Sequence, residues 1–172
     1  QYAWIMGPIT LSHMDASISA DHTKDWEVNV ERYARSHNYQ YSTRDEDLTY
    51  NPDNEVVGTS ILQRVFDVKN KSKDMEAVVG AIKSIKETLV KLDADIARRV
   101  YRNQFRSADR KDISLVYPFE SWTRFENSNG LPPNFATAYD KINGKGSWQK
   151  NVVKVLDNHT DGWYDEIRVM IK

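Results

Sequence analysis

The segment LSHMDASISADHTKDW, residues 11–26, concentrates side chains that metal ions bind. His13, Asp15 and His22 supply the imidazole and carboxylate groups that zinc, iron or manganese accept. A metal site needs at least three ligands that converge on one point, and the equivalent segment further along the chain, SWTRFENSNGLPPN, contains no histidine or aspartate. We therefore interpret residues 11–26 as a polar connector whose aspartates lie near the start of a helix, where the helix dipole favours them. No metal or other cofactor is expected, and these three residues are retained only as metal candidates.

A second polar group is the acidic run Asp45, Glu46 and Asp47 within TRDEDL. Paired carboxylates can bind a divalent cation or exchange a proton. If this run lies in a strand, Asp45 and Asp47 face the same side and could act together. The simpler interpretation, which we adopt, is a solvated surface segment.

One predicted hairpin is strongly basic and carries aromatic residues between its cations. Its basic residues are Arg98, Arg99, Arg102, Arg106, Arg110 and Lys111. Such a surface could bind nucleic acid or an anionic ligand. An RNA-recognition module would need a glycine and stacking aromatics in its third strand, whereas this chain has DISLVYPF there, and the net charge of the chain is −1. The sequence therefore predicts no nucleic-acid partner.

The same hairpin supplies the candidate ligand-binding residues Tyr101, Asn103 and Phe105. In a strand they alternate onto one side, so that an amide lies between two aromatic rings. A half-buried amide needs a hydrogen-bond partner, which could be a ligand, a buried water or a backbone group. These residues, or their alternates if the strand has the opposite orientation, would contact a small-molecule ligand.

The four histidines do not form a recognisable catalytic group. His37 and His159 fall at the ends of predicted helices, where a partly charged imidazole suits the helix dipole. No serine-histidine-acid order, glycine-rich phosphate loop or H-E-x-x-H motif is present. None of the histidines is predicted at mid-helix, facing a sheet, as an axial haem ligand would require.

Hydrophobic periodicity predicts an alternation of strands and helices. The expected strands cover residues 2–12, 60–69, 97–106, 112–119 and 163–172, and the expected helices cover 25–36, 74–92 and 134–158, the last broken at Gly144 and Gly146. From residue 60 onward the order is β-α-β-β-α-β, which is that of a ferredoxin-like unit.

Two windows of the chain match at a constant offset. When DWEVNVERYARSH is placed over SWQKNVVKVLDNH, Trp26 aligns with Trp148 and His37 with His159. This match predicts a duplication, with a partial first unit in residues 1–59 and a complete second unit in residues 60–172. Both tryptophans would be helix residues packed on the sheet, and the missing half of the first unit is expected upstream. The alternative is one ferredoxin-like unit with an unrelated N-terminal extension.

The hairpin RRVYRNQF…DISLVYPFESWTRFE, followed by a tryptophan-bearing helix, resembles the dimeric α/β-barrel superfamily. The likeness is closest to uncharacterised secreted bacterial proteins with a duplicated build. It implies an α+β fold in which tandem ferredoxin-like units, the first incomplete, join antiparallel sheets into a pseudo-dimeric barrel. The superfamily includes haem-degrading and quinol-forming monooxygenases and haem-dependent peroxidases, so the fold alone does not select an activity.

Composition narrows the function without fixing it. The chain has 172 residues, no cysteine and no apolar run of the roughly 20 residues that a membrane helix needs. We expect a non-enzymatic protein that binds a small ligand or serves a structural role, with no membrane partner. A homodimer and a secreted or periplasmic location are compatible with the resemblance. The alternative is a cofactor-free or haem-using oxygenase.

Overall fold

The computed structural model describes residues 20–33, 40–53, 60–105, 111–128 and 130–169. It divides into two compact units, residues 1–39 and 40–172. In the first unit, helix α1 (Ala20–Asn29) is followed by a short 3₁₀ turn, η2 (Glu31–Tyr33). The helix predicted for residues 25–36 therefore begins five residues earlier, and Asp21 lies in its first turn. Trp26 is half-buried.

The second unit is built on a five-stranded antiparallel sheet. The strands are β1 (Ser42–Arg44), β2 (Ser60–Val68), β3 (Arg99–Asn103), β4 (Ile113–Phe119) and β5 (Thr160–Val169). Their order across the sheet is β1-β3-β4-β2-β5, so β4 separates β2 from β3, and β1 and β5 are the edges among the described strands. From Ser60 the chain follows the strand and helix order expected from the sequence, with several helical segments between β4 and β5.

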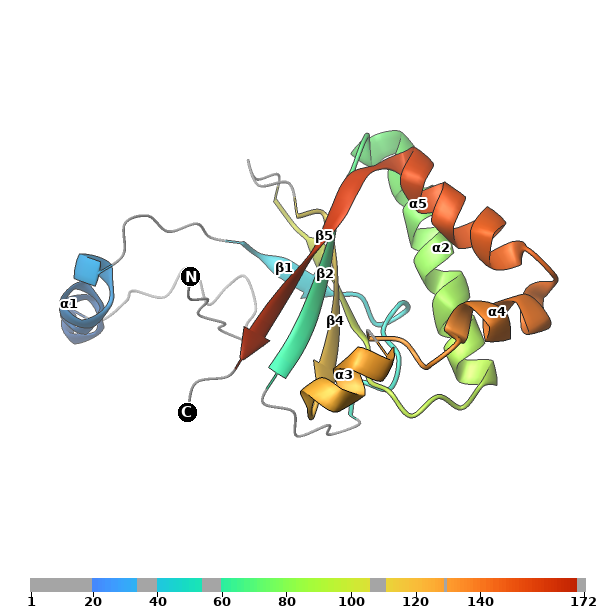
Figure 1. Ribbon diagram of the computed structural model, residues 1–172. Coiled ribbons are helices and arrows are strands. Elements are labelled where there is room, and N and C mark those ends of the chain that lie inside the picture. The colour runs from blue at the N-terminus through green and yellow to red at the C-terminus, as the bar shows by residue number, and fades with distance from the viewer. Residues whose placement is uncertain (1–19, 34–39, 54–59, 106–110, 129, 170–172) are drawn as a thin grey trace. The chain divides into compact units, whose positions relative to one another are not determined.

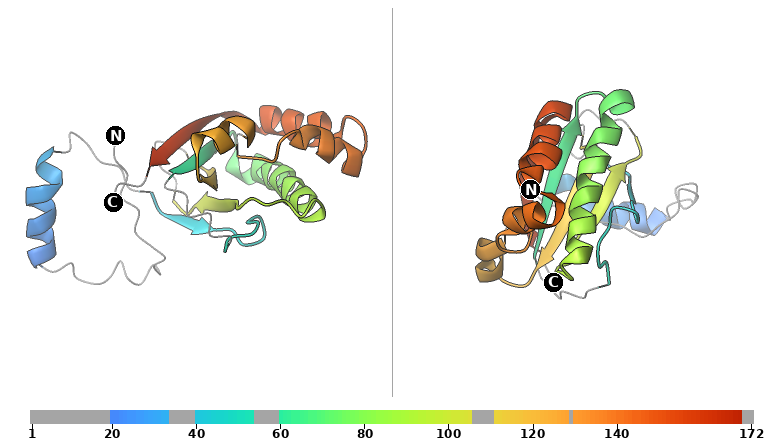
Figure 2. Two further views of the ribbon diagram at one scale, coloured as in Figure 1. Left: turned by 60° about the horizontal axis from the view of Figure 1, so that its bottom comes forward. Right: turned by 90° about the vertical axis from the view of Figure 1, so that its right-hand side faces the viewer.

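Helices cover one face of this sheet. Helix α2 (Lys71–Lys91), helix α4 (Phe135–Asn143) and helix α5 (Lys154–His159) lie on the same side of the strands (Figures 1 and 2). Leu62 and Phe66 of β2 pack there with Ile82 of α2 in the main core cluster. The covered face therefore consists of the alternate strand residues that the pleat directs toward α2.

Helix α2 has the apolar stripe that the sequence predicts, with Val78, Ile82, Ile85 and Leu89 all buried. Its first residue differs from the predicted range 74–92. Asn70 is the N-cap, and its side-chain oxygen accepts the backbone N–H of Ser72 at 3.1 Å. The helix therefore begins at Lys71, three residues before the predicted start.

The predicted break at Gly144 and Gly146 is confirmed, because α4 ends at Asn143 and both glycines have positive φ. The chain then forms a π-helical turn, η3 (Gln149–Val153), that continues into α5. The Asp140 carboxylate accepts the backbone N–H groups of Trp148 at 2.7 Å and Gly146 at 2.8 Å, and these bonds lower the pKa of Asp140. An aspartate in α4 thus stabilises the start of the next helix.

Helix α3 (Trp122–Ser128) follows β4 directly. Trp122 and Phe125 contact the ring of Phe119, with ring centroids 5.4 and 4.9 Å away. This small aromatic group anchors α3 at one end of the sheet (Figure 1).

The expectation of a barrel is wrong for the described residues. Their five strands form an open sheet, because the edges β1 and β5 are not paired with each other. Closure would need a second sheet, and the part of residues 1–59 that the structure describes supplies only α1, η2 and β1. Strand β1 extends the one sheet instead, by pairing with β3. The predicted strand 2–12 lies outside the described residues, so the duplication stays a prediction.

Candidate functional site

The candidate ligand residues Tyr101 and Asn103 lie on the face of the sheet opposite the helices. Val100 pairs with Leu115, and both belong to the core beneath α2. Tyr101, one residue further along, pairs with Ser114 and faces the other way. The alternates, not the named candidates, therefore face the space between the sheet and the helices.

The three candidates do not share one surface. Asn103 ends β3, and its side-chain oxygen accepts the backbone N–H of Phe105 at 3.3 Å. Phe105 lies beyond the strand, is exposed, and packs edge-on against Tyr41 with ring centroids 5.6 Å apart. The amide of Asn103 thus has a local backbone partner.

The metal candidates are not placed by the structure. His13 and Asp15 lie outside the described residues, and His22 falls within α1, where its side chain is not described. In the described ranges, no three histidine, aspartate or glutamate side chains are grouped closely enough to hold a metal ion.

The acidic run forms a turn rather than a strand. The Asp45 carboxylate accepts the backbone N–H of Leu48 and pairs with Arg102. On the far side of the turn, the Lys86 ammonium donates to the backbone carbonyls of Glu46 and Asp47 at 3.1 and 2.8 Å. An open pocket of about 430 Å³ lies here, and the bonds made by Asp45 leave that carboxylate no role as a cation ligand in this arrangement.

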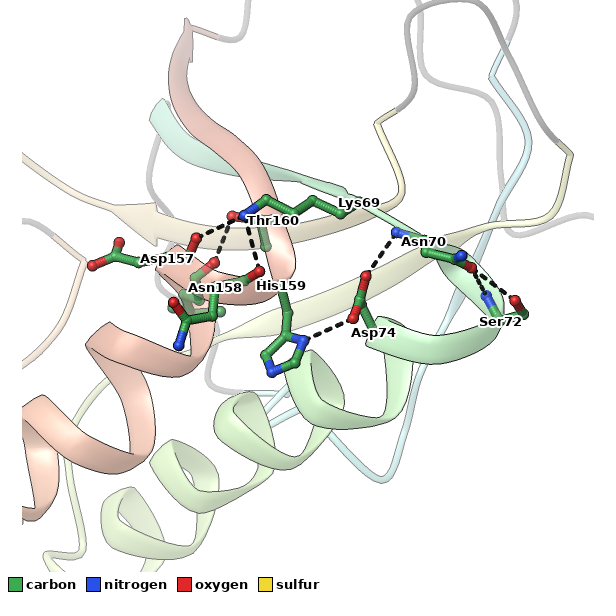
Figure 3. Close-up of polar contacts among 9 residues, drawn as sticks. Lys69, Asn70, Ser72, Asp74, Asp157, Asn158, His159 and Thr160 are labelled. Carbon is green, nitrogen blue, oxygen red and sulfur yellow. Dashed lines mark hydrogen bonds and ion pairs between the residues drawn. The ribbon is translucent and has the colours of Figure 1, made fainter.

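A histidine–aspartate pair joins two helix ends (Figure 3). His159 is the last residue of α5, as the capping prediction expected, and its Nδ1 lies 2.8 Å from Oδ1 of Asp74 in the first turn of α2. The other carboxylate oxygen of Asp74 accepts the backbone N–H of Asn70 at 3.0 Å. Lys69 completes the contact, because its ammonium donates to the carbonyls of Asp157 and Asn158 at the C-terminus of α5.

Such a pair could act as a general base only if a reacting group lay beside Nε2 of His159. No described residue forms a hydrogen bond with this nitrogen. The nearby Ser72 hydroxyl donates to the Asn70 side chain at 2.7 Å instead, and Figure 3 shows it on the far side of Asp74 from the imidazole. The contacts of Lys69, Asn70, Asp74, Asp157, Asn158 and His159 connect α2 and α5, and we call this group of residues the helix clasp.

The helix clasp should make stability depend on pH in acid. The hydrogen bond from His159, followed by that from the Asn70 backbone, lowers the pKa of Asp74 below its ordinary value of 3.8. A carboxyl with a lowered pKa stabilises the fold fully above that ordinary value, and this contribution is lost as the pH falls through the lowered one.

We therefore expect Asp74→Asn to be less stable than the natural chain at neutral pH, and the two stabilities to begin to converge below about pH 4 and to meet only below the lowered pKa of Asp74. Urea unfolding between pH 2 and 7 measures this, with Glu87→Gln on an exposed position of α2 as the control. A difference between Asp74→Asn and the natural chain that stays constant over the whole range would show that the charge of Asp74 does not contribute.

Strand β5 is the most exposed apolar element of the sheet. Four of the ten large apolar or aromatic side chains that are exposed in the described part of the chain belong to it: Trp163 (53%), Tyr164 (37%), Ile167 (39%) and Val169 (57%). Trp163 pairs with Phe66, and Ile167 pairs with Leu62. Because Phe66 and Leu62 belong to the core under the helices, Trp163 and Ile167 lie on the same face of the sheet, at its exposed edge. Sequence periodicity predicted the strand but not that it would be an edge.

Charges on β5 are matched by residues of the same sheet. Arg64 of β2 donates to both carboxylate oxygens of Asp165 at 2.8 and 2.7 Å and lies over the ring of Trp163. Glu166 contacts both Lys111 and Arg168, and these bonds lower its pKa against the opposing effect of burial. Asp165 and Glu166 of β5 are therefore both paired with cations, and neither leaves an unpaired charge beside the outer edge of the strand.

Comparison of the chain with family models, with curated proteins and with solved structures gives no match. Within the described ranges, no helix is both long and apolar enough to cross a membrane.

Proposed function

We propose that this chain is a non-enzymatic binding protein that recognises an extended strand of a partner at the outer edge of β5. The observation that carries the proposal is that a ten-residue edge strand displays four exposed large apolar side chains. Such an edge offers a row of backbone N–H and C=O groups to another strand, and natural proteins usually protect edges of this kind.

The backbone and the side chains of β5 would contribute differently to binding. Main-chain hydrogen bonds along the edge give affinity, while alternate side chains choose the sequence of the added strand. On the helix-covered face, Trp163 and Ile167 would favour apolar residues on the incoming strand, since aromatic and β-branched cross-strand pairs are stabilising.

The absence of a catalytic arrangement among the described residues supports a binding role. The helix clasp holds the Asp74–His159 pair in structural contacts, and the acidic turn uses Asp45 to bind Arg102.

The small-ligand function expected from the sequence is a second candidate, at the opposite face of the sheet. The pairing of β1 with β3 places Arg44 opposite Tyr101 and Ser42 opposite Asn103. Arg44 is paired with Glu46, so the aromatic ring and the polar groups on these neighbouring strands suit a small planar ligand without charge. This surface does not include the β5 edge, so the two candidates predict different binding residues.

A synthetic peptide with the β5 sequence, TDGWYDEIRV, tests the proposed function. Added to the ¹⁵N-labelled full chain, it should shift amide resonances of β5 and the adjoining β2 in a saturable way, because it can continue the hydrogen-bond pattern of the edge. The matched control is the same peptide with alternate backbone nitrogens methylated on its pairing edge, which cannot donate and should not bind. Shifts confined to Tyr101, Asn103 and their neighbours would favour the small-ligand surface, and the absence of shifts at β5 would refute strand recognition.

A further inference from the structure

Strand β5 has a pattern that is complementary to itself. Trp163 and Ile167 lie two residues on either side of Asp165 and point to the same face of the sheet. A two-fold axis perpendicular to the sheet at Asp165 would place Trp163 of each chain opposite Ile167 of the other chain. Each of these is an aromatic–β-branched pair of the kind that stabilises antiparallel strands.

We infer that the strand recognised by β5 is β5 of a second copy of this chain, antiparallel and centred on Asp165. This inference rests on the proposed function, because it names the partner of the same edge. The pairing would overlap residues 161–169 and join two five-stranded sheets into one continuous sheet. It differs from a barrel, in which sheet faces meet, because here only the edges come together.

The central residue of this arrangement needs explanation, because Asp165 would lie opposite Asp165 of the other copy. Each carboxylate is held by two hydrogen bonds from Arg64 of its own chain. On the other face, Tyr164 would lie opposite Glu166, whose charge is met by Lys111 and Arg168. Like charges directly opposite one another are destabilising unless neutralised, and here each copy brings its own cation.

Neighbouring registers can be distinguished by their central residue. Opposite residues must point to the same face, so the axis can pass through Tyr164, Asp165 or Glu166 with every side chain kept on its own face. An axis at Tyr164 would place Trp163 opposite Asp165, and an axis at Glu166 would place Ile167 opposite Asp165. Only the axis at Asp165 pairs Trp163 with Ile167.

Sedimentation velocity of the full chain over a concentration series tests the association. We expect reversible dimers, and Ile167→Asp should weaken them at least tenfold, because it places a carboxylate opposite Trp163 beside the paired Asp165 residues. The control is Leu92→Asp on the C-cap of α2, a position with a matched exposure of 37% against 39% for Ile167. A chain that stays monomeric although the β5 peptide binds would overturn the inference and leave the proposed function intact. Dimers that Ile167→Asp does not weaken would also overturn it, because they would use another surface.

Because the natural chain has no cysteine, single cysteine variants map the axis directly. Under mild oxidation, Asp165→Cys should form a disulfide-linked dimer, since residues opposite one another across an antiparallel pair lie within disulfide reach. Tyr164→Cys and Glu166→Cys should cross-link much less, because each would lie two residues out of register with its own counterpart. Preferential linkage through either of these two would overturn the axis at Asp165.

Discussion

Replacing Arg98 with alanine is expected to lower the free energy of unfolding by about 3 kcal/mol. Arg98 is fully buried just before β3, and its Nη2 donates to the backbone carbonyls of Leu48 at 3.0 Å and Ile82 at 3.1 Å. Alanine would leave both buried acceptors without this donor and would open a cavity between α2 and the sheet. Ile82 lies within α2, so its carbonyl keeps its helical hydrogen bond. The loss of the bond to the Leu48 carbonyl, at about 1–3 kcal/mol, and the cavity together set the size of the effect.

The positive charge of Arg98 should contribute less to the free energy of unfolding than the volume that its side chain fills. Burial lowers the pKa of Arg98, with neighbouring Tyr117 opposing that effect. The Nε and Nη1 atoms have no hydrogen-bond partner among the described residues. Replacing a poorly paired buried cation with an apolar side chain of similar length removes its desolvation cost. Arg98→Met is therefore expected to be clearly more stable than Arg98→Ala.

Urea denaturation of the two variants measures these effects, with Arg102→Ala as the matched control. Arg102 lies on the same face of β3, but it is half-exposed and pairs with Asp45 near the surface. Its partner Asp45 is only 10% exposed but keeps the hydrogen bond from the Leu48 backbone, so the loss should be smaller than that of Arg98→Ala. Equal losses for Arg98→Ala and Arg102→Ala would show that Arg98 does not support the core.

Replacing Trp148 with alanine should be the second large effect, at about 3 kcal/mol. Its ring packs edge-on against Phe135 and Tyr139, with centroid distances of 5.7 and 5.4 Å, in the smaller core cluster. The sequence predicted this tryptophan as a helix residue packed on the sheet. It lies immediately before the π-helical turn and packs on α4 instead. The loss therefore combines apolar burial with two aromatic contacts.

Thermal unfolding of Trp148→Ala compared with Trp122→Ala isolates this contribution. Trp122 also contacts two aromatic rings, but it is 59% exposed on α3, so its loss should cost only about 1 kcal/mol. If the two variants lose equal stability, the packing between α4 and η3 is not what stabilises this region.

The local elements were predictable from the sequence because their signals are local. The apolar stripe of α2 needs only residues three and four positions apart, and the break after α4 needs only Gly144 and Gly146. The order of elements from Ser60 followed from these signals together with strand alternation. Element boundaries were less accurate, since Asn70 and Ser72 are both good N-caps and only the structure selects between them.

Contacts between distant residues were not predictable in the same way. The helix clasp pairs Asp74 with His159, which are 85 residues apart, and no periodicity indicates which helix ends meet. Strand β1 is three exposed polar residues long, so its place in the sheet depends on pairing with β3 rather than on its own sequence. The orientation of Tyr101 and Asn103 was left open for the same reason, because alternation gives two faces without stating which one the helices cover.

Amide hydrogen exchange along β5 tests the central claim, that this strand is an edge that accepts another strand. In dilute protein, the amides of β5 that bond to β2 should exchange slowly and those that point outward should exchange rapidly, in alternation along the strand. At saturation with the TDGWYDEIRV peptide, the rapidly exchanging set should become protected while the other amides change little. Uniformly slow exchange in dilute protein without peptide, or outward amides that remain rapid at saturation, would contradict the account.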